Sequence, residues 1–334
     1  MIPALSVVII GRNEGERLKR CIQSVQHMNS PFALSQVEII YVDSDSNDNS
    51  CEIAHGLGAK VLSVKPERPA AAIGRNAGWR AARFPFVLFL DGDTLLHPDF
   101  VKTAYEVLRT ENDVAVVFGH RREMYPNASI YQRALDLDWL YPLGDVAFCG
   151  GDALMRRDVL KQVDGYNPNL IAGEEPEMCQ RIRAAGYRVR HIDHPMTLHD
   201  LAITHAWQYW RRAVRTGHAY AEVSNLLRDS KHPLWQADAQ RNWRNFTIWS
   251  GLFLIALITS IVGMTLWPWA IFLLFFLTMS LRTSWKNRWR SENKVTLFWY
   301  GIHSQWQHVP IAIGQINYYW QSFKGKRQQL IEYK

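Results

Sequence analysis

The sequence is poor in cysteine and contains no pair of cysteines in a CxxC spacing. Its 334 residues include four scattered cysteines: Cys21, Cys51, Cys149 and Cys179. This pattern gives no basis for a cysteine-based zinc site, and it favours reduced, buried thiols in a cytosolic domain.

The chain also lacks a dense run of Lys and Arg and the spacing of a zinc finger, which argues against a nucleic-acid partner. Lys and Arg outnumber Asp and Glu by 38 to 31, for a net charge of +7. This mild excess is compatible with anionic partners such as phosphates or a membrane surface.

A third absence lies near the C-terminus, where residues 247–281 carry no charge. The stretch is too long for one spanning helix of ~20 residues, and "WPW" at 267–269 interrupts it. Arg and Lys flank both ends, which by the positive-inside rule places both in the cytoplasm. We predict a membrane hairpin over 241–290 that turns at 267–269, with a pair of buried soluble helices as the alternative. An interfacial amphipathic helix and a basic tail are predicted over 291–334.

Residues 1–120 alternate short apolar runs with helical patterns. The opening "MIPALSVVII" has neither a basic n-region nor a cleavage site, so it predicts a strand and not a signal peptide. Apolar strands are predicted at 5–10, 37–42, 59–64 and 86–90. The alternation predicts an α/β domain with a mostly parallel sheet and helices on both faces. Ligands bind beyond the carboxyl ends of such strands, which brings three segments to one rim: Gly11–Glu14, Asp43–Asp48 and Asp91–Asp93.

The segment "LFLDGDTLLHPDF" at 88–100 ends a strand in two closely spaced carboxylates, Asp91 and Asp93. Carboxylate oxygens are hard ligands that suit Mg²⁺ or Mn²⁺, which in turn bridge phosphates. A turn capped by Asp and Gly is the alternative.

Further motifs accompany DGD in a fixed order: "SVVIIGRNEGERL", "VDSDSND", "GRNAGWRAA", "GEEPEMCQRIRAAGY" and "LHD". Together they resemble the family 2 glycosyltransferases over roughly residues 4–215. The resemblance implies a GT-A fold, a nucleotide-diphosphate sugar donor, a divalent metal and inversion at the sugar carbon. It divides residues 1–240 into a nucleotide half (about 1–115) and an acceptor half (about 116–240).

The resemblance also implies donor contacts. Asn13 and Glu14 of the "GRNE" segment would line the nucleotide pocket. Arg75 and Asn76 of "GRNAG" would contact the diphosphate or the ribose. Asp43 would meet the base, which is uracil in relatives, and Asp91 would face the ribose or a phosphate-bound water. Arg211 matches part of a Gln-x-x-Arg-Trp motif and would hold the donor diphosphate, a lipid phosphate or the membrane surface. The donor residues implied are Asn13, Glu14, Asp43, Asp45, Arg75, Asn76, Asp91 and Arg211.

The same resemblance assigns the metal, the base and the acceptor pocket. Asp93 would bind Mn²⁺ or Mg²⁺ directly, and His199 would complete the shell, with His191 and His194 as rivals. Glu175 would be the general base, where the family usually has Asp. Acceptor contacts are implied for Gly151, Asp152 and Glu174.

The expected activity is inverting transfer from a nucleotide-diphosphate sugar, with UDP as the expected nucleotide. The expected acceptor is a lipid-linked saccharide or another envelope or exopolysaccharide acceptor. The chain would sit in the cytoplasmic membrane with its catalytic domain facing the cytoplasm. One alternative is a sugar nucleotidyltransferase, for which "GRNEGE" is a poor phosphate loop. Another is a non-catalytic membrane scaffold, against which the joint presence of DGD, Glu175 and His199 speaks.

Overall fold

The computed structural model describes residues 4–326, and these divide into two compact units. The first unit comprises residues up to Met124, Tyr141–Leu201 and Asp229–Leu234. The second comprises Tyr125–Leu140, Ala202–Arg228 and the chain from Trp235 onward. The prediction placed one boundary at residue 240, whereas the chain passes between the units several times.

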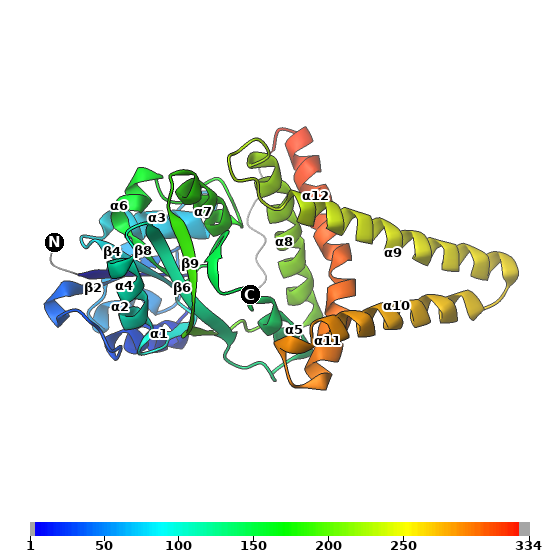
Figure 1. Cartoon of the computed structure of the whole chain (residues 1–334), viewed down its shortest axis with the longest axis horizontal. Coiled ribbons are helices and arrows are strands. Elements are labelled where there is room, and N and C mark those ends of the chain that lie inside the picture. Colours follow the sequence, from blue (N-terminus) through cyan, green and yellow to red (C-terminus); the bar gives the residue numbers. More distant parts are fainter. Residues whose placement is uncertain (1–3, 327–334) are drawn as a thin grey trace. The chain divides into compact units, whose positions relative to one another are not determined.

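The first unit is built on a nine-stranded sheet of strand order β3-β2-β1-β4-β8-β6-β9-β5, with β7 paired to β9 (Figure 1). Strands β1, β2, β3 and β4 are mutually parallel, β6 is parallel to β9, and β8 runs antiparallel between β4 and β6. This confirms the predicted α/β class with a mostly parallel sheet. The strands are β1 Leu5–Gly11, β2 Val37–Asp43, β3 Lys60–Ser63, β4 Phe86–Asp91, β5 Thr94–Leu96, β6 Val114–Glu123, β7 Gly144–Val146, β8 Ala153–Arg156 and β9 Arg188–His199.

Helices cover both faces of this sheet. Consecutive residues Val7, Val8 and Ile9 of β1 are all fully buried, as expected where neither face meets water. Helix α3 approaches β1 so closely that a Cβ on Gly78 would lie 2.2 Å from Val8 Cγ1. The helices of this unit are α1 Glu16–Gln26, α2 Ser50–Gly56, α3 Ala71–Ala81, α4 Phe100–Thr110, α6 Arg157–Gln162 and α7 Glu174–Ala184.

The register of the central strands brings the predicted rim together. Gly11 at the end of β1 pairs with Asp43 at the end of β2. Ile10 pairs with Asp91 at the end of β4. The polar segments that follow these strands therefore leave the sheet at one edge.

Strands β8 and β9 were not predicted, because residues 114–200 show no clear periodicity. Strand β9 runs for 12 residues beside β6 and also pairs with the short β5. In that pairing His199 is opposite Thr94, the residue that follows Asp93. The unpredicted strand thus carries the late histidine to the DGD turn.

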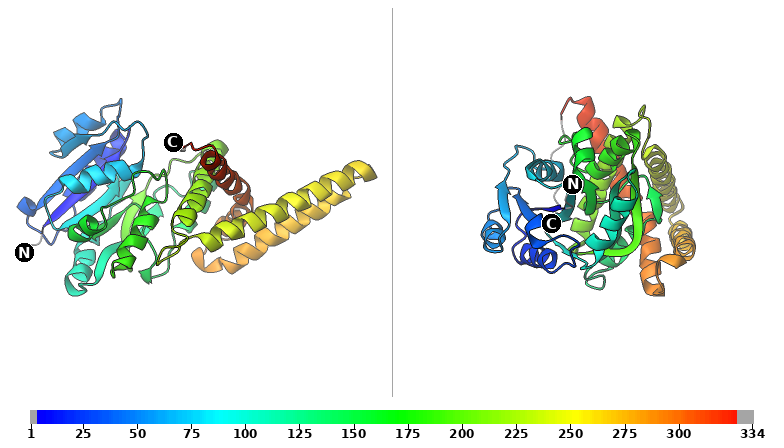
Figure 2. Two further views of the ribbon diagram at one scale, coloured as in Figure 1. Left: turned by 90° about the horizontal axis from the view of Figure 1, so that it is seen from above. Right: turned by 60° about the vertical axis from the view of Figure 1, so that its left-hand side comes forward.

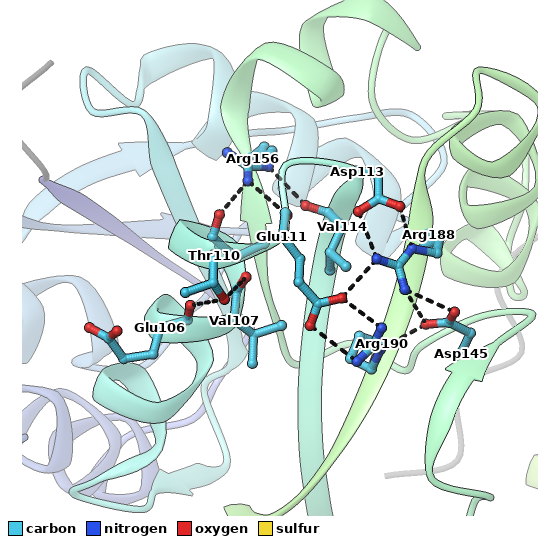
Figure 3. A network of polar contacts seen from close by, with 11 residues as sticks. Glu106, Val107, Thr110, Glu111, Asp113, Val114, Asp145, Arg156, Arg188 and Arg190 are labelled. Atoms are coloured by element: carbon cyan, nitrogen blue, oxygen red, sulfur yellow. Dashed lines mark hydrogen bonds and ion pairs between the residues drawn. The ribbon is translucent and has the colours of Figure 1, made fainter.

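The opposite end of β9 is fixed by a network of ion pairs (Figure 3). Arg188 lies 2.6 Å from Asp113 Oδ1 and 2.7 Å from Glu111 Oε2. Arg190 lies 2.7 Å from Asp145 Oδ1 in β7. The network ties β7 and the start of β6 to β9.

The second unit is helical, and two of its helices, α9 and α10, form an antiparallel hairpin (Figure 2). Helices α9 and α10 meet at a turn over 264–266, three residues before the predicted turn. Pro268 does not break a helix here; it stands in the first turn of α10, where its missing N–H has no intrahelical partner to lose. The helices are α5 Ile130–Asp138, α8 Ala206–Leu226, α9 Gln236–Gly263, α10 Trp267–Lys286, α11 Lys294–Trp306 and α12 His308–Phe323.

The segment predicted as one interfacial helix is two packed helices. In α11, His303 is buried and bridges Asp138 of α5 (Nε2 to Oδ2, 3.1 Å) and Tyr209 of α8 (Nδ1 to the hydroxyl, 2.7 Å). In α12, the buried Gln315 accepts a hydrogen bond from Asn242 of α9. The segment thus contains two helices where one was predicted; its interfacial location stays a prediction, and the predicted tail beyond residue 326 lies outside the described residues.

Candidate active site

Two carboxylates and an imidazole meet at the carboxyl end of the sheet. Asp91 ends β4, Asp93 lies in the turn before β5, and His199 ends β9. One ligand atom from each lies within 4.8 Å of the others, and His199 Nε2 is 3.1 Å from Asp93 Oδ1. Asp93 and His199 are each 5% exposed. Carboxylate oxygens with a neutral imidazole form a donor set that fits Mn²⁺ or Mg²⁺.

The rival histidines are engaged elsewhere. His191 Nδ1 is 2.8 Å from the Pro142 carbonyl oxygen, and its ring stacks on Phe118 at 4.6 Å. His194 Nδ1 contacts the Pro195 carbonyl oxygen. The choice of His199 over both is consistent with this arrangement.

Two arginines clamp Asp91, one on each carboxylate oxygen. Arg75 Nη2 lies 2.9 Å from Oδ1, and Arg121 Nη2 lies 3.2 Å from Oδ2. Burial acts to raise the pKa of Asp91, but the two guanidinium groups hold it below its usual value. Sequence reasoning missed Arg121, although the run "VAVVFGHRR" shows a buried strand continuing into cations.

The acidic pair of the "GEEPE" motif opens helix α7. Gly173 before it is left-handed (φ 83°), a conformation that glycine adopts without strain. The helix N-terminus favours carboxylates. Burial and then the Glu174 carboxylate raise the pKa of Glu175 to about 7, against the lowering effect of Arg75. A carboxyl poised there can take a proton near neutral pH.

The two acids differ in access. Glu174 is 4% exposed and accepts a hydrogen bond from Arg75, and its acceptor contact stays a prediction. The Glu175 side chain is 14% exposed, which leaves it the more accessible acid of the pair. Glu177 is buried and pairs with Arg181, as expected for a structural helix turn.

Known families match this chain along most of its length. The model described as "Glycosyl transferase family 2" matches residues 6–164. That described as "Glycosyl transferase family group 2" matches residues 86–281, more than half of the chain. The chain is a family 2 glycosyltransferase.

Curated relatives of this glycosyltransferase are similar over only part of their length. Glycosyltransferase AglE of Haloferax volcanii is 25% identical over 195 residues, 56% of this chain and 63% of AglE. Poly(ribitol-phosphate) beta-N-acetylglucosaminyltransferase TarP of Staphylococcus aureus is 30% identical over 118 residues, 34% of this chain and 35% of TarP. The chain therefore matches less than two thirds of the length of either relative.

Solved structures are similar over more of the chain and support the GT-A fold. The mannosyltransferase PcManGT from Pyrobaculum calidifontis, in complex with GDP-Man and Mn²⁺, has a TM-score of 0.64 at 18% identity. That match covers 95% of this chain and 88% of PcManGT. TarS 1-349 of S. aureus in complex with UDP-GlcNAc has a TM-score of 0.50 at 14% identity, over 91% of this chain and 92% of that one.

On the nucleotide side of the glycosyltransferase, the loops after β1 and β2 are tied together. Asp43 is buried and accepts hydrogen bonds from the Tyr41 hydroxyl and the Ser46 backbone N–H, both at 3.0 Å. Asn13, at φ 56°, accepts from the Asn47 N–H at 2.9 Å. These hydrogen bonds fix the two loops, and base recognition by Asp43 and the place of Asn13 in the nucleotide pocket stay predictions.

Two further donor candidates contact neighbouring cations. Glu14 lies 2.9 Å from Arg17, and its backbone N–H donates to Ser50 Oγ. Asp45 is exposed and lies 2.8 Å from Lys65. Their donor contacts stay predictions.

Asn76 makes three hydrogen bonds inside the first unit. Its amide donates to the Tyr166 carbonyl and accepts from the Tyr166 N–H and from Trp79 Nε1. The side chain is buried and its carbonyl accepts two hydrogen bonds, so Asn76 fixes Tyr166 in the structure, and its donor contact stays a prediction.

The acceptor segment is also turned inward. Asp152 has no exposed side-chain surface; it accepts from the Asp91 backbone N–H at 3.1 Å and from the Thr197 hydroxyl at 2.7 Å. These contacts help to position Asp91, and the acceptor contact of Asp152 stays a prediction. Burial raises the pKa of Asp152 to about 6, although Arg121 opposes this. Gly151 lies directly against the Arg75–Asp91 pair.

Arg211 belongs to the second unit, on α8, where its guanidinium lies 6.0 Å from the Trp207 ring centroid. Its predicted contact with a donor diphosphate stays a prediction.

Proposed function

We propose that this protein transfers a glycosyl group from a nucleoside diphosphate sugar to an acceptor hydroxyl, with inversion at the anomeric carbon and a divalent cation. The observation that carries the proposal is one buried cluster in which Asp93 and His199 adjoin Asp91, while Glu175 contacts the same arginine as Asp91. The family membership favours a glycosyltransferase over a sugar nucleotidyltransferase.

Asp93 and His199 would hold Mn²⁺ or Mg²⁺, which supplies charge neutralisation for the departing diphosphate. Asp91, held by Arg75 and Arg121, keeps the turn that carries Asp93 in place. Glu175 accepts the proton of the acceptor hydroxyl as the oxygen attacks the anomeric carbon from the face opposite the leaving group. Transfer with inversion takes place in a single displacement, which requires a general base for the acceptor and a separate site for the leaving group.

We propose UDP as the donor nucleotide because the "VDSDSND" segment resembles the uracil-binding segment of relatives. The solved neighbours include complexes of one enzyme with GDP-Man and another with UDP-GlcNAc, which supports a nucleotide-sugar donor.

The test is a screen of UDP- and GDP-sugars for nucleotide release with and without Mn²⁺, with membrane extract as the acceptor source. Metal-dependent release of UDP from one donor, with the sugar appearing in a lipid-soluble product, is the expected result. Release of GDP alone would reassign the base. The proposal would be contradicted if the wild type released no nucleotide from any donor in response to Mn²⁺. In that case the wild type would be as inactive as Asp93→Asn.

We further propose that the α9–α10 hairpin anchors the enzyme in the cytoplasmic membrane. Helix α9 is long and apolar enough to cross a bilayer, with a mean hydropathy of 2.0 in its apolar window, only 11% of which is buried. Its charge-free part, 247–263, is about 25 Å long at ~1.5 Å per residue, close to the ~30 Å of bilayer hydrocarbon. An exposed apolar surface of this extent calls for a non-aqueous partner.

Tryptophans support the same arrangement, since they favour the two membrane interfaces. Trp267 lies at the tip of the hairpin and Trp285 at its base, both exposed. Arg288 lies 4.5 Å from the Trp285 ring centroid, so a cation lies beside the tryptophan at the base of the hairpin. A membrane-held active site favours a lipid-linked saccharide as acceptor.

A further inference from the structure

Arg75 joins the two chemically distinct parts of the site. Its Nη2 lies 2.9 Å from Asp91 Oδ1, at the strand that leads to the metal turn. Its Nη1 lies 2.8 Å from Glu174 Oε1 and 2.9 Å from Glu175 Oε1, at the start of α7. One guanidinium on α3 therefore contacts three carboxylates from two other elements.

The surroundings leave this guanidinium little freedom to move. Its side chain is 4% exposed. The Tyr166 ring lies on one side, with its centroid 5.7 Å from Arg75 Cζ. Gly151 lies against Nη2, where an added Cβ would be only 2.5 Å away. A glycine is required at 151 for close approach and not for backbone conformation.

The same burial argues against the donor contact expected for Arg75. A diphosphate needs exposed N–H groups, and both terminal nitrogens already meet carboxylates inside the protein. A planar guanidinium can hold several carboxylates in fixed directions, which an ammonium cannot do equally well. The geometry suits an internal brace better than a ligand for substrate.

We propose that Arg75 is a positioning residue that fixes the base Glu175 relative to the metal turn, and that Gly151 is small so that this brace can form. The inference rests on the proposed glycosyl transfer and identifies what aligns its two halves. Misplacing a reacting group by about 1 Å can cost ~10²-fold in rate.

The experiment compares Arg75→Gln, Arg75→Lys and Gly151→Ala with wild type and with Arg80→Gln. Arg80 is a matched control because it is on the same helix but exposed, and it contacts the exposed Asp164 and the Trp79 ring and none of the three carboxylates that Arg75 contacts. The full-length protein is used in lipid nanodiscs. The measurements are kcat, the KM for the UDP-sugar, the pH profile of kcat, and UDP–Mn²⁺ affinity by calorimetry.

We expect Arg75→Gln to lower kcat by ~10²-fold while the donor KM and UDP–Mn²⁺ affinity change less than about threefold. The acidic limb of its pH profile of kcat should shift to higher pH. The pKa of Glu175 rises in this variant because the Arg75 cation is lost while the carboxylates of Glu174 and Asp91 remain. Arg75→Lys should recover part of kcat and return the limb toward wild type. Arg80→Gln should match wild type.

Gly151→Ala keeps every charge and crowds the Arg75–Asp91 pair, so it tests the geometry of the brace without a change in charge. It should lower kcat without raising the donor KM, and it remains decisive if circular dichroism shows that Arg75→Gln does not fold. A raised donor KM with unchanged kcat and pH limb in either variant would overturn the positioning role. That result would leave the proposed function intact, since Asp93→Asn tests the metal-dependent transfer separately.

Discussion

The two units depart from ordinary protein surfaces and interiors in opposite ways. The first unit buries ions: Arg75, Asp93, Asp152 and Glu174 are each at most 5% exposed. The second exposes apolar side chains, with Met264 at the hairpin tip 95% exposed. Burying charges costs free energy even when they are paired, and exposing an apolar face costs free energy in water. Each departure therefore marks a place where function outweighs stability.

The largest expected effect concerns the buried ions of the first unit. If the turn that carries Asp93 were dispensable, burial of these ions would have no functional reason. We predict that Asp93→Asn lowers transfer by about 10³-fold or more, because it removes an anionic ligand of the cation that neutralises the leaving group. Radiolabelled sugar transfer over a Mn²⁺ titration measures it. Asp164→Asn, an exposed acid in the same unit, is the control. Full Mn²⁺-dependent turnover in Asp93→Asn would remove this metal assignment.

The next largest effect separates the two acids of α7. Glu175→Gln should reduce kcat by ~10²-fold or more with donor binding retained, as expected when a general base is lost. Glu174→Gln should reduce it less if the protein folds, since that carboxylate faces Arg75 and not the exterior. Kinetics and calorimetric UDP binding on both variants measure this. The reverse order of effects would shift the base by one residue.

The pH profile sharpens the same point without a mutation. Glu175 accepts a proton only as a carboxylate, and its pKa is about 7. We therefore expect kcat to rise about tenfold per pH unit well below that pH and to level off above it. Initial rates in buffers of constant ionic strength test it. A rate that does not change across the acid limb would mean that Glu175 is not the base.

The smallest expected effect on activity concerns the exposed apolar α9–α10 hairpin. Single cysteines there should report its topology without altering activity. Cysteines at positions 264 and 290 would be labelled with an impermeant maleimide in intact cells. Labelling at 264 but not 290 is expected for a hairpin that reaches the far interface, with its Arg-flanked ends in the cytoplasm. Labelling at 290 would mean one span with the tail outside, and labelling at neither would mean re-entry. Complete recovery of the protein in the soluble fraction would contradict membrane insertion.

Much of the first unit was predictable because its signals are local. Buried strands such as β1 are continuous apolar runs, and Asp91, Asp93 and Glu175 stand in short motifs. The metal cluster also needed His199, which the family pattern supplied and the β5–β9 pairing explains.

What could not be predicted depends on contacts between distant residues. Arg121 meets Asp91 across 30 positions of sequence, and Arg75 meets Glu174 across 99. Asp152 stands in a segment that resembles an acceptor pocket, and its sequence context does not indicate that its side chain is fully buried. No periodicity reveals which way such a side chain faces, because that depends on the tertiary partner.

Helix α5 has a consequence for how this chain is made and shortened. It is encoded near the middle of the sequence, yet its apolar residues Ala134 and Leu137 pack with Leu297 and Tyr300 of α11. Tyr300 of α11 follows its partner Asp138 of α5 by 162 residues, so during synthesis α5 leaves the ribosome long before α11 does. A truncation at residue 240, intended to yield a water-soluble catalytic fragment, would remove α11 and expose the apolar face of α5. A workable fragment would keep α11 and shorten only the hairpin.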